Sequence, residues 1–204
     1  MTHANPTLSN GYSIVPPRHV ANVATFLEMR ARPVASSQAS AESLTLERWR
    51  DADPAAYRAL FRVIGENWLW YSRLVMPDHE LLRIFRDPRI EIYRLLDKGE
   101  VAGLLELDFS ETDECELSFF GLVPDAIGRG AGRFLMNEAI GLVWAKPIRR
   151  FWVHTCTFDH PAALPFYRRS GFTPYQVAVE IHPDPRLTGY MPRHAAPHVP
   201  IIES

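Results

Sequence analysis

A glycine-rich turn between an apolar strand and a helix is the feature that most constrains this chain. The strand-like run Glu114 to Val123 leads into a turn, residues 124–132, and a helix is expected from about Gly130 to Ala145. Glycines remove side chains that block close approach, and a helix N-terminus carries partial positive charge. The turn therefore predicts a site where backbone N–H groups hold a phosphate or pyrophosphate.

Two arginines lie among the glycines of this turn. Gly128, Gly130 and Gly132 alternate with Arg129, and Arg133 follows directly. Guanidinium groups form charge-assisted hydrogen bonds with phosphate oxygens, so both arginines are candidate anion ligands. A Gly-x-Gly after a strand is also found in ordinary strand-to-helix turns, and that alternative stays open on these residues alone.

The same turn disagrees with two other nucleotide-binding motifs. A Rossmann site has Gly-x-Gly-x-x-Gly at the first strand-to-helix turn and an acidic residue about 20 positions later. Here the turn comes late in the chain and lacks that spacing. A P-loop has Gly-Lys-Ser/Thr at the helix start, whereas Gly132 is followed by Arg133 and Phe134. Nucleotide hydrolysis is disfavoured.

Hydrophobic periodicity predicts a mixed α/β domain. Helical spacing from Leu46 to Ile64, with Asp53 before Pro54, indicates one broken helix or two short ones. Short links between the central strands predict an antiparallel meander, and the later alternation of strand and helix predicts a parallel crossover. The expected strands cover residues 19–30, 90–96, 101–108, 114–123, 150–157 and 173–181, and the expected helices cover 78–85, 130–145 and 161–170.

Composition favours one domain over residues 1–204, with a leader over about 1–18 and an extended Pro-rich tail over 183–204. Of the 204 residues, 47% are hydrophobic and 23% charged, which suits a single core. A net charge of -2 gives no field that would gather nucleic acid or an anionic membrane. No secretory leader and no run of 18 apolar residues is evident, so we expect a cytoplasmic protein.

Cysteine and histidine do not form a recognisable metal site. Cys115 and Cys156 are too few for a disulfide framework and are not spaced as a zinc pair. His154, Cys156 and His160 lie near one another in sequence, but no carboxylate or second cysteine completes a ligand set. We therefore expect no metal and no covalent Cys156 intermediate.

Two motifs resemble the GNAT (GCN5-related N-acetyltransferase) superfamily. Val123 to Leu135 is similar to its acetyl-CoA pyrophosphate motif, Gln/Arg-x-x-Gly-x-Gly/Ala, with Gly130 and Gly132 at the small positions. Ile127 stands where Gln or Arg is usual, so one contact of the family is missing and Arg129 is a candidate to replace it.

The second motif lies downstream. Asp159 to Phe172 resembles the signature Asn-x-x-Ala-x-x-Phe-Tyr-x-x-x-Gly-Phe, with His160 in place of the Asn. The two motifs stand in the family's order and span roughly residues 90 to 180. The resemblance implies a mostly antiparallel mixed sheet flanked by helices that opens near the turn, with acetyl-CoA as acyl donor. The coenzyme ligands it implies are Leu122, Val123, Gly128, Arg129, Gly130, Ala131, Gly132, Arg133 and His160.

Acetyl transfer to an amine requires a base and an acid. An alkyl ammonium has a pKa near about 10 and must lose a proton, for which a carboxylate is suited. The resemblance implies that Glu116 is this base and that Tyr167 protonates the departing thiolate. Glu116 is otherwise a strand residue that faces water, with Asp108 and Glu114 as weaker candidates, and Tyr167 is otherwise a packed helix residue.

The acceptor is less constrained. Trp68, Trp70 and Tyr71 form either an aromatic acceptor pocket or part of the core. We expect a small-molecule amine, with a protein lysine or N-terminus, or a non-catalytic acyl-CoA-binding module, as alternatives. One strand and a Pro-rich tail stand where the family often has a closing hairpin, and we therefore consider a homodimer with exchanged strands.

Overall fold

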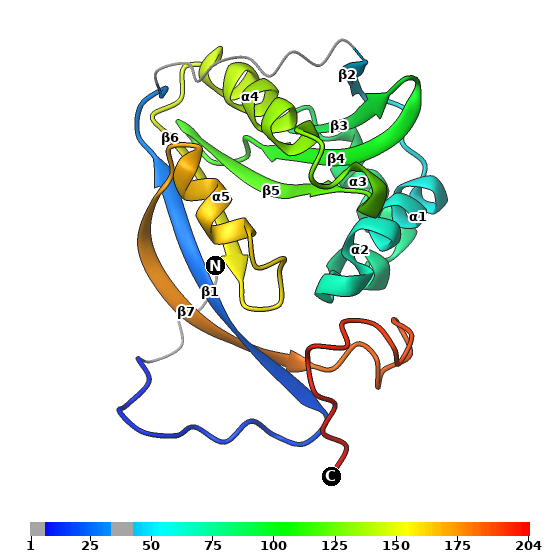
Figure 1. The fold of residues 1–204 in the computed structure, drawn as a ribbon, viewed down its shortest axis with the longest axis vertical. Helices are drawn as coiled ribbons and strands as arrows, with labels where there is room; N and C mark the ends of the chain where they lie inside the picture. The colour runs from blue at the N-terminus through cyan, green and yellow to red at the C-terminus, as the bar shows by residue number, and fades with distance from the viewer. Residues whose placement is uncertain (1–6, 34–42) are drawn as a thin grey trace.

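A seven-stranded mixed sheet forms the centre of the molecule (Figure 1). The computed structural model describes residues 7–33 and 43–204, and within them the strand order is β2-β3-β4-β5-β6-β1-β7. Neighbouring strands are antiparallel except β5 and β6, which are parallel. The strands are β1 (His19–Met29), β2 (Leu44–Arg48), β3 (Ile90–Asp97), β4 (Glu100–Asp108), β5 (Glu114–Leu122), β6 (Arg150–Cys156) and β7 (Thr173–Pro183).

Helices cover both faces of the sheet, as Figure 1 shows. On one face, α4 (Ala131–Trp144) and α5 (Ala163–Arg169) pack on the largest apolar cluster, which includes Leu27, Leu105 and Phe151. On the other face, α1 (Pro54–Gly65), α2 (Ser72–Val75) and α3 (Asp78–Arg86) lie over a second cluster. None of the helices in the described ranges combines the length and apolar composition needed to cross a bilayer. The predicted fold class is confirmed.

The helix predicted from Leu46 onward is wrong in its first part. Residues Leu44–Arg48 form β2, because they pair with β3 along the sheet edge, Leu46 lying opposite Leu95. The helix starts at Pro54, where the Asp53 carboxylate accepts hydrogen bonds from the N–H groups of Ala55 and Ala56 at 2.9 and 3.3 Å. Asp53 satisfies N–H groups that the first helical turn leaves unpaired.

β1 lies between β6 and β7, although it comes first in the chain. Ala24 is opposite Cys156 on one side and Ala178 on the other. The N-terminal strand thus supplies the antiparallel partner of both β6 and β7 within one chain. The leader expected over residues 1–18 lies partly outside the described residues, and its described part before β1 has no helix or strand.

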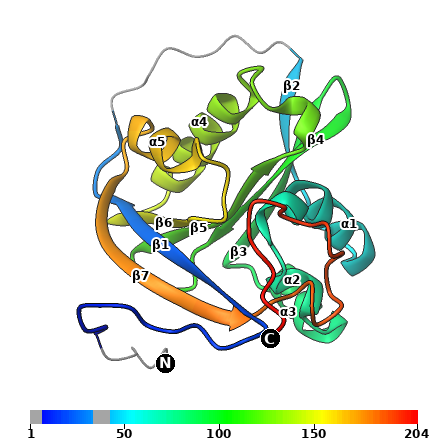
Figure 2. The same cartoon turned by 60° about the horizontal axis from the view of Figure 1, so that its bottom comes forward.

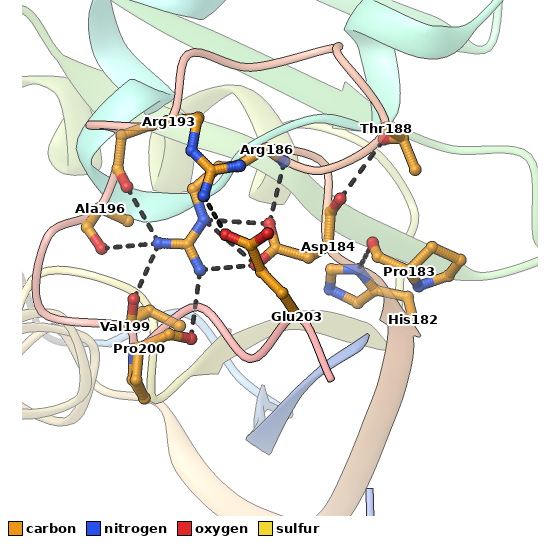
Figure 3. Close-up of polar contacts among 11 residues, drawn as sticks. His182, Pro183, Asp184, Arg186, Thr188, Arg193, Ala196, Val199, Pro200 and Glu203 are labelled. Carbon is orange, nitrogen blue, oxygen red and sulfur yellow. Dashed lines mark hydrogen bonds and ion pairs between the residues drawn. The ribbon is translucent and has the colours of Figure 1, made fainter. Parts of the chain in front are cut away.

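The chain after Pro183 contains neither helix nor strand, but it turns back on itself instead of running extended. Its centre is the buried guanidinium of Arg186, which pairs with the Asp184 carboxylate at 2.7 Å (Figure 3). Arg186 also donates to four backbone carbonyls, those of residues 195, 196, 199 and 200. A single side chain thereby holds this segment, residues 184–204, in a fixed path.

The C-terminal segment packs on the connection between α1 and α2. Its apolar residues Met191 and Val199 belong to a cluster with Leu69 and Phe158, against which Tyr71 also packs. Figure 1 and Figure 2 show the segment passing beside α2, which is far from it in sequence. The end of the chain therefore borders the same face of the sheet as α1–α3.

Candidate active site

The parallel strands β5 and β6 separate after a short paired stretch. Pairing runs from Glu114 opposite Arg150 to Glu116 opposite Trp152 and then ends. Just beyond, β5 has a bulge, because Leu107 and Glu106 of β4 pair with Leu117 and Phe119 and leave Ser118 unpaired. Bulges bend a strand and increase its local twist. The result is an opening between the strands, here called the seam.

Glu116 lies where the seam begins. Its neighbours Cys115 and Leu117 are buried in the α4–α5 cluster, so its side chain points to the opposite face, with 28% of it exposed. Burial raises the pKa of Glu116 to about 7, with further increases from the carboxylates of Asp108 and Glu106 and a smaller opposing effect from Arg73. A carboxylate with such a pKa can accept a proton near neutral pH.

A buried polar cluster that sequence reasoning missed lies next to Glu116. The fully buried Glu106 carboxylate accepts a hydrogen bond from the Tyr57 hydroxyl at 2.6 Å and pairs with the guanidinium of Arg73. Arg73 also lies over the Phe119 ring, at 4.9 Å from its centroid. The available signal was a single charge inside the otherwise apolar strand β4, because a buried carboxylate requires a partner.

His154 on β6 contacts Glu116 across the seam. Its Nδ1 is 3.8 Å from Glu116 Oε1, and 48% of its side chain is exposed. The Phe26 ring of β1 lies beside the imidazole, with centroids 5.5 Å apart. His154, considered above only as a metal ligand, thus connects the Glu116 carboxylate to solvent.

Tyr167 lies on the opposite face of the sheet, on α5. It is 7% exposed and packs among three aromatic rings, including Phe120 of β5 at 6.2 Å between centroids. Burial raises the pKa of the Tyr167 hydroxyl well above its ordinary value, and the Asp159 carboxylate adds to the shift. The phenol therefore stays protonated at neutral pH. Glu116 and Tyr167 approach the seam from its two faces.

Asp159, which sequence reasoning did not select, joins the two sides of the seam. Its carboxylate accepts hydrogen bonds from the Thr155 hydroxyl at 2.8 Å and the Cys156 N–H at 2.9 Å, both on β6. It also accepts one from the indole N–H of Trp70 at 3.1 Å. Trp70 lies between α1 and α2 and packs on Phe119 of β5. The Trp70 side chain thus spans the seam.

His160, at the usual Asn position of the second motif, has a local structural role. Its Nδ1 accepts a hydrogen bond from the Ala162 N–H at 3.0 Å just before α5, and its ring lies 5.2 Å from that of Trp68. Trp68 in turn contacts the ring of His198 in the C-terminal segment. Trp68 therefore lies between His160 and the C-terminal segment, whereas Trp70 borders the seam and also packs in the core.

The glycine-rich turn has the geometry expected of an anion site. Gly128 and Gly130 have positive φ values of 82° and 86°, and no atom lies within 4 Å of the position of an added Cβ at either. α4 begins directly after Gly130, without a side-chain cap, and its first internal bond is from Phe134 N–H to the Gly130 carbonyl. The N–H groups of residues 131–133 are thus left without helical partners.

Two arginines of this turn are available for an anion. Arg129 and Arg133 are exposed, and neither forms an ion pair with any described residue. Gly132 is more enclosed, since a Cβ there would lie 3.6 Å from Leu122 Cδ1. Ile127, which replaces the usual Gln or Arg, is 45% exposed and brings no polar group.

The expectation for the backbone at the end of β5 is wrong for one residue. The N–H of Val123 donates to the Ala102 carbonyl of β4 at 3.0 Å, so it is not free to hold a ligand. Consecutive N–H groups of a strand point to opposite edges. The N–H groups of Leu122 and Phe120 therefore face the open edge of β5, whereas that of Val123 faces β4.

The other candidates are less suited to catalysis. Glu114 pairs with Arg150 at 3.0 Å, and Asp108 accepts a hydrogen bond from the Ser110 N–H at 2.7 Å. Burial and the nearby Asp159 carboxylate raise the pKa of the Cys156 thiol to about 12, which disfavours the nucleophilic thiolate. Among the described residues, no three metal-binding side chains gather at one place.

The sequence model of the Acetyltransferase (GNAT) family matches residues 44–172. The chain belongs to this family. The match includes the turn, Glu116, Asp159 and Tyr167, and it leaves β1, β7 and the C-terminal segment outside. No protein in the curated set matches the sequence.

Solved structures share the fold at low sequence identity. A GCN5-related N-acetyltransferase from Sphaerobacter thermophilus has a TM-score of 0.62 and 13% identity over 82% of this chain. One from Kribbella flavida has a TM-score of 0.55 and 13% identity over 84%. An aminoglycoside acetyltransferase from an uncultured soil metagenomic sample has a TM-score of 0.51 and 20% identity. The match covers 63% of this chain and 88% of that protein. The chain spans only 52% and 62% of the first two proteins.

Proposed function

We propose that this protein transfers an acetyl group from acetyl-CoA to the amine of a small molecule by direct transfer. The observation that carries the proposal is the seam, with the Glu116 carboxylate on one face and the Tyr167 phenol on the other. A thioester in the seam would be open to an amine from the Glu116 side and to an acid from the Tyr167 side. This arrangement fits a single displacement without a covalent enzyme intermediate.

The glycine-rich turn and the open edge of β5 suit the binding of acetyl-CoA. The free N–H groups at the start of α4, together with Arg129 and Arg133, suit the pyrophosphate of acetyl-CoA. From there the outward N–H groups of Leu122 and Phe120 lead along β5 toward Glu116. Such groups can bind the amides of the pantetheine arm and the thioester oxygen. The exposed apolar side chain of Ile127 leaves the two arginines as the charged contacts of the turn.

The face of the sheet that carries Glu116 suits the binding and deprotonation of an amine. Carboxylates of Glu116, Asp108 and Glu106 lie on this face, with Arg73 as the nearby cation, so an ammonium is attracted there. Glu116 accepts the ammonium proton, and His154 at 3.8 Å offers a path for it to solvent. The neutral amine nitrogen forms a bond to the thioester carbon, the C–S bond breaks, and Tyr167 donates its proton to the thiolate. The nitrogen loses its second proton as the amide forms, and this proton restores the Tyr167 phenol, so the products are the amide, the free thiol and the one proton passed on by Glu116.

A small acceptor suits the surroundings of this face. The C-terminal segment packs on the connection that carries Trp70 and borders the face beside α2 (Figure 2). An extended peptide needs an open groove, whereas a small amine does not. A related fold carries the name aminoglycoside acetyltransferase, and an amino sugar is one such small amine.

Titration with acetyl-CoA, run beside NADH, tests the proposal. We expect saturable binding of acetyl-CoA alone, and thiol release when a library of small amines is added. Gly132→Glu should weaken acetyl-CoA binding at least about tenfold, because its carboxylate would meet the phosphates at the helix N-terminus. Gly141→Glu, farther along α4 where an added Cβ meets no atom within 4 Å, is the matched control.

Two results would count against the proposal. A protein that does not bind acetyl-CoA has no donor, and the proposal is then wrong. Binding without thiol release for any amine, together with unchanged binding in Glu116→Gln, would instead identify an acyl-CoA-binding module.

A further inference from the structure

β7 is an edge strand with an apolar face that the rest of the described chain leaves uncovered. It pairs with β1 along one edge only, and ten of its eleven residues are at least partly exposed. Val177, Val179 and Ile181 point to one face and are 63%, 43% and 45% exposed, next to Val23 of β1 at 42%. These four residues are called the β7 patch. Figure 1 shows β7 at the outer margin of the sheet.

The strand carries few of the features that keep edge strands apart, and its prolines and bulge lie toward its ends. Protected edges commonly carry lysine, an inward charge or a proline within the strand. β7 has neither lysine nor arginine, and its prolines, Pro174 and Pro183, lie near its two ends. Its single bulge, at Tyr175 opposite Phe26 and Leu27, leaves the stretch from Gln176 onward in regular register. A long regular apolar edge is suited to pairing with another strand.

The sequence of β7 is complementary to itself about Ala178, which is also its midpoint. Full overlap of two antiparallel copies places Ala178 opposite Ala178 and Val177 opposite Val179 of the second copy. On the other face, Gln176 lies opposite Glu180 of the second copy, so an amide donor meets a carboxylate and no like charges meet. Glu180 already accepts a hydrogen bond from Asn22 at 2.8 Å, which fixes its side chain. Cross-strand pairs of β-branched residues stabilise such an edge.

We propose that β7 is the interface of a homodimer, in which two copies pair antiparallel about Ala178 and their sheets become continuous. The two-fold axis then runs normal to the sheet, so both Glu116 faces open on the same side. The β7 patches of the two copies join into one apolar stripe. This interface rests on the edge strand alone and does not depend on the proposed enzymatic activity.

The oligomeric mass in solution tests the interface. We expect twice the mass of the chain for the unaltered protein and the mass of one chain for Val177→Lys/Val179→Lys. Four lysines would then face one another across the strand pair, and like charges opposite each other destabilise pairing. Val63→Lys is the control, because Val63 is 54% exposed but lies on α1. A monomeric unaltered protein, or a dimer that survives the double substitution, overturns the proposal.

Disulfide formation tests the register and does not rely on the folding of the lysine variant. Cα atoms of paired residues lie about 4.5–5.5 Å apart, within the range of about 4.4–6.8 Å that disulfides span, so Ala178→Cys should give a covalent dimer under mild oxidant. Gln176→Cys thiols would be displaced by four residue steps, about 13 Å, and should not crosslink. The unaltered chain controls for Cys115 and Cys156. Equal crosslinking of both variants, or none for Ala178→Cys, overturns this register.

Discussion

The part of the chain matched by the family model and the part outside it use buried charge in opposite ways. Inside residues 44–172, Glu106 and Arg73 are held beside Glu116, whose pKa is raised to about 7. Outside, the buried pair of Arg186 and Asp184 is surrounded by backbone carbonyls. The first arrangement leaves one carboxylate poorly stabilised, whereas the second satisfies its charges.

This difference separates the requirements of chemistry from those of stability. A base that titrates near neutral pH must be disfavoured as a charge in the folded protein, which lowers stability. The C-terminal segment has no helix or strand, so it depends on a stabilising buried ion pair to hold its path. We therefore expect substitutions beside Glu116, within residues 44–172, to change turnover. Substitutions at the pair of Arg186 and Asp184, outside that range, should change the free energy of unfolding.

The largest expected effect is at Arg186. Arg186→Met leaves the buried Asp184 carboxylate without its partner, and breaking such a pair costs about 3–5 kcal/mol. Denaturant unfolding should show this loss, while the affinity for acetyl-CoA of the protein that remains folded stays unchanged. Arg193→Met is the control, because the ion pair of Arg193 with Glu203 is more than half exposed and such pairs contribute about 0–1 kcal/mol. Equal losses in both variants would remove the special role of Arg186.

Substitution of Glu116 should have the opposite pattern. Glu116→Gln removes the proposed base and should lower kcat by about 10²–10⁴-fold, with little change in the dissociation constant for acetyl-CoA. Steady-state kinetics and titration measure the two quantities. Glu47→Gln is a control on an exposed strand residue of β2. Undiminished turnover in Glu116→Gln would transfer the role of base to another group.

The pH dependence of the unaltered protein follows from the same carboxylate. Turnover should rise as the pH passes through about 7, where Glu116 loses its proton. In the unfolded chain its pKa is about 4.3, so folding is stabilised by the bound proton below that pH and loses this contribution as the pH rises toward 7. Melting curves of Glu116→Gln against the unaltered protein should diverge over this interval, with the variant gaining relative stability. Parallel curves would contradict the raised pKa.

A smaller kinetic effect is expected at Tyr167. Tyr167→Phe removes the hydroxyl but keeps the ring among its aromatic neighbours, so folding should be preserved while kcat falls by about 10²-fold. The fold loss in kcat should be the same for different amine acceptors, since the proton goes to the thiolate of the donor, which all of them share. Tyr190→Phe, in the exposed part of the C-terminal segment, should leave kcat unchanged. If both variants retain full activity, Tyr167 is a packing residue.

The smallest effect concerns the residue that joins the two sides of the seam. Trp70→Phe removes the hydrogen bond to Asp159 and should lower the free energy of unfolding by about 0.5–1.5 kcal/mol. Because Trp70 borders the face proposed for the acceptor, KM for the amine should change more than KM for acetyl-CoA. Trp144→Phe, on α4 at the other face, serves as the comparison. A larger effect on acetyl-CoA than on the amine would place Trp70 on the donor side.

Much of the structure within residues 44–172 could be predicted, because the sequence signals there are local. The glycines of the turn, the Asp53 cap and the strand alternation each lie within a few residues, and their structures agree with the sequence pattern. The link from Trp70 to Asp159 joins residues 89 positions apart. Arg73 and Glu106 are also distant in sequence, and nothing near either residue indicates its partner. Such long-range contacts join the two sides of the seam and set the charges beside Glu116, so they could not be predicted from local sequence.

The position of β1 has a consequence for how the protein is made. Ala24 pairs with Cys156, 132 positions later, and with Ala178 beyond it. During synthesis the N-terminal strand must wait for both partners, and contacts of such high sequence separation slow folding. A nascent chain that ends before β6 therefore carries an apolar strand with no place in the sheet, and this strand is a natural target for chaperones until the ribosome has finished.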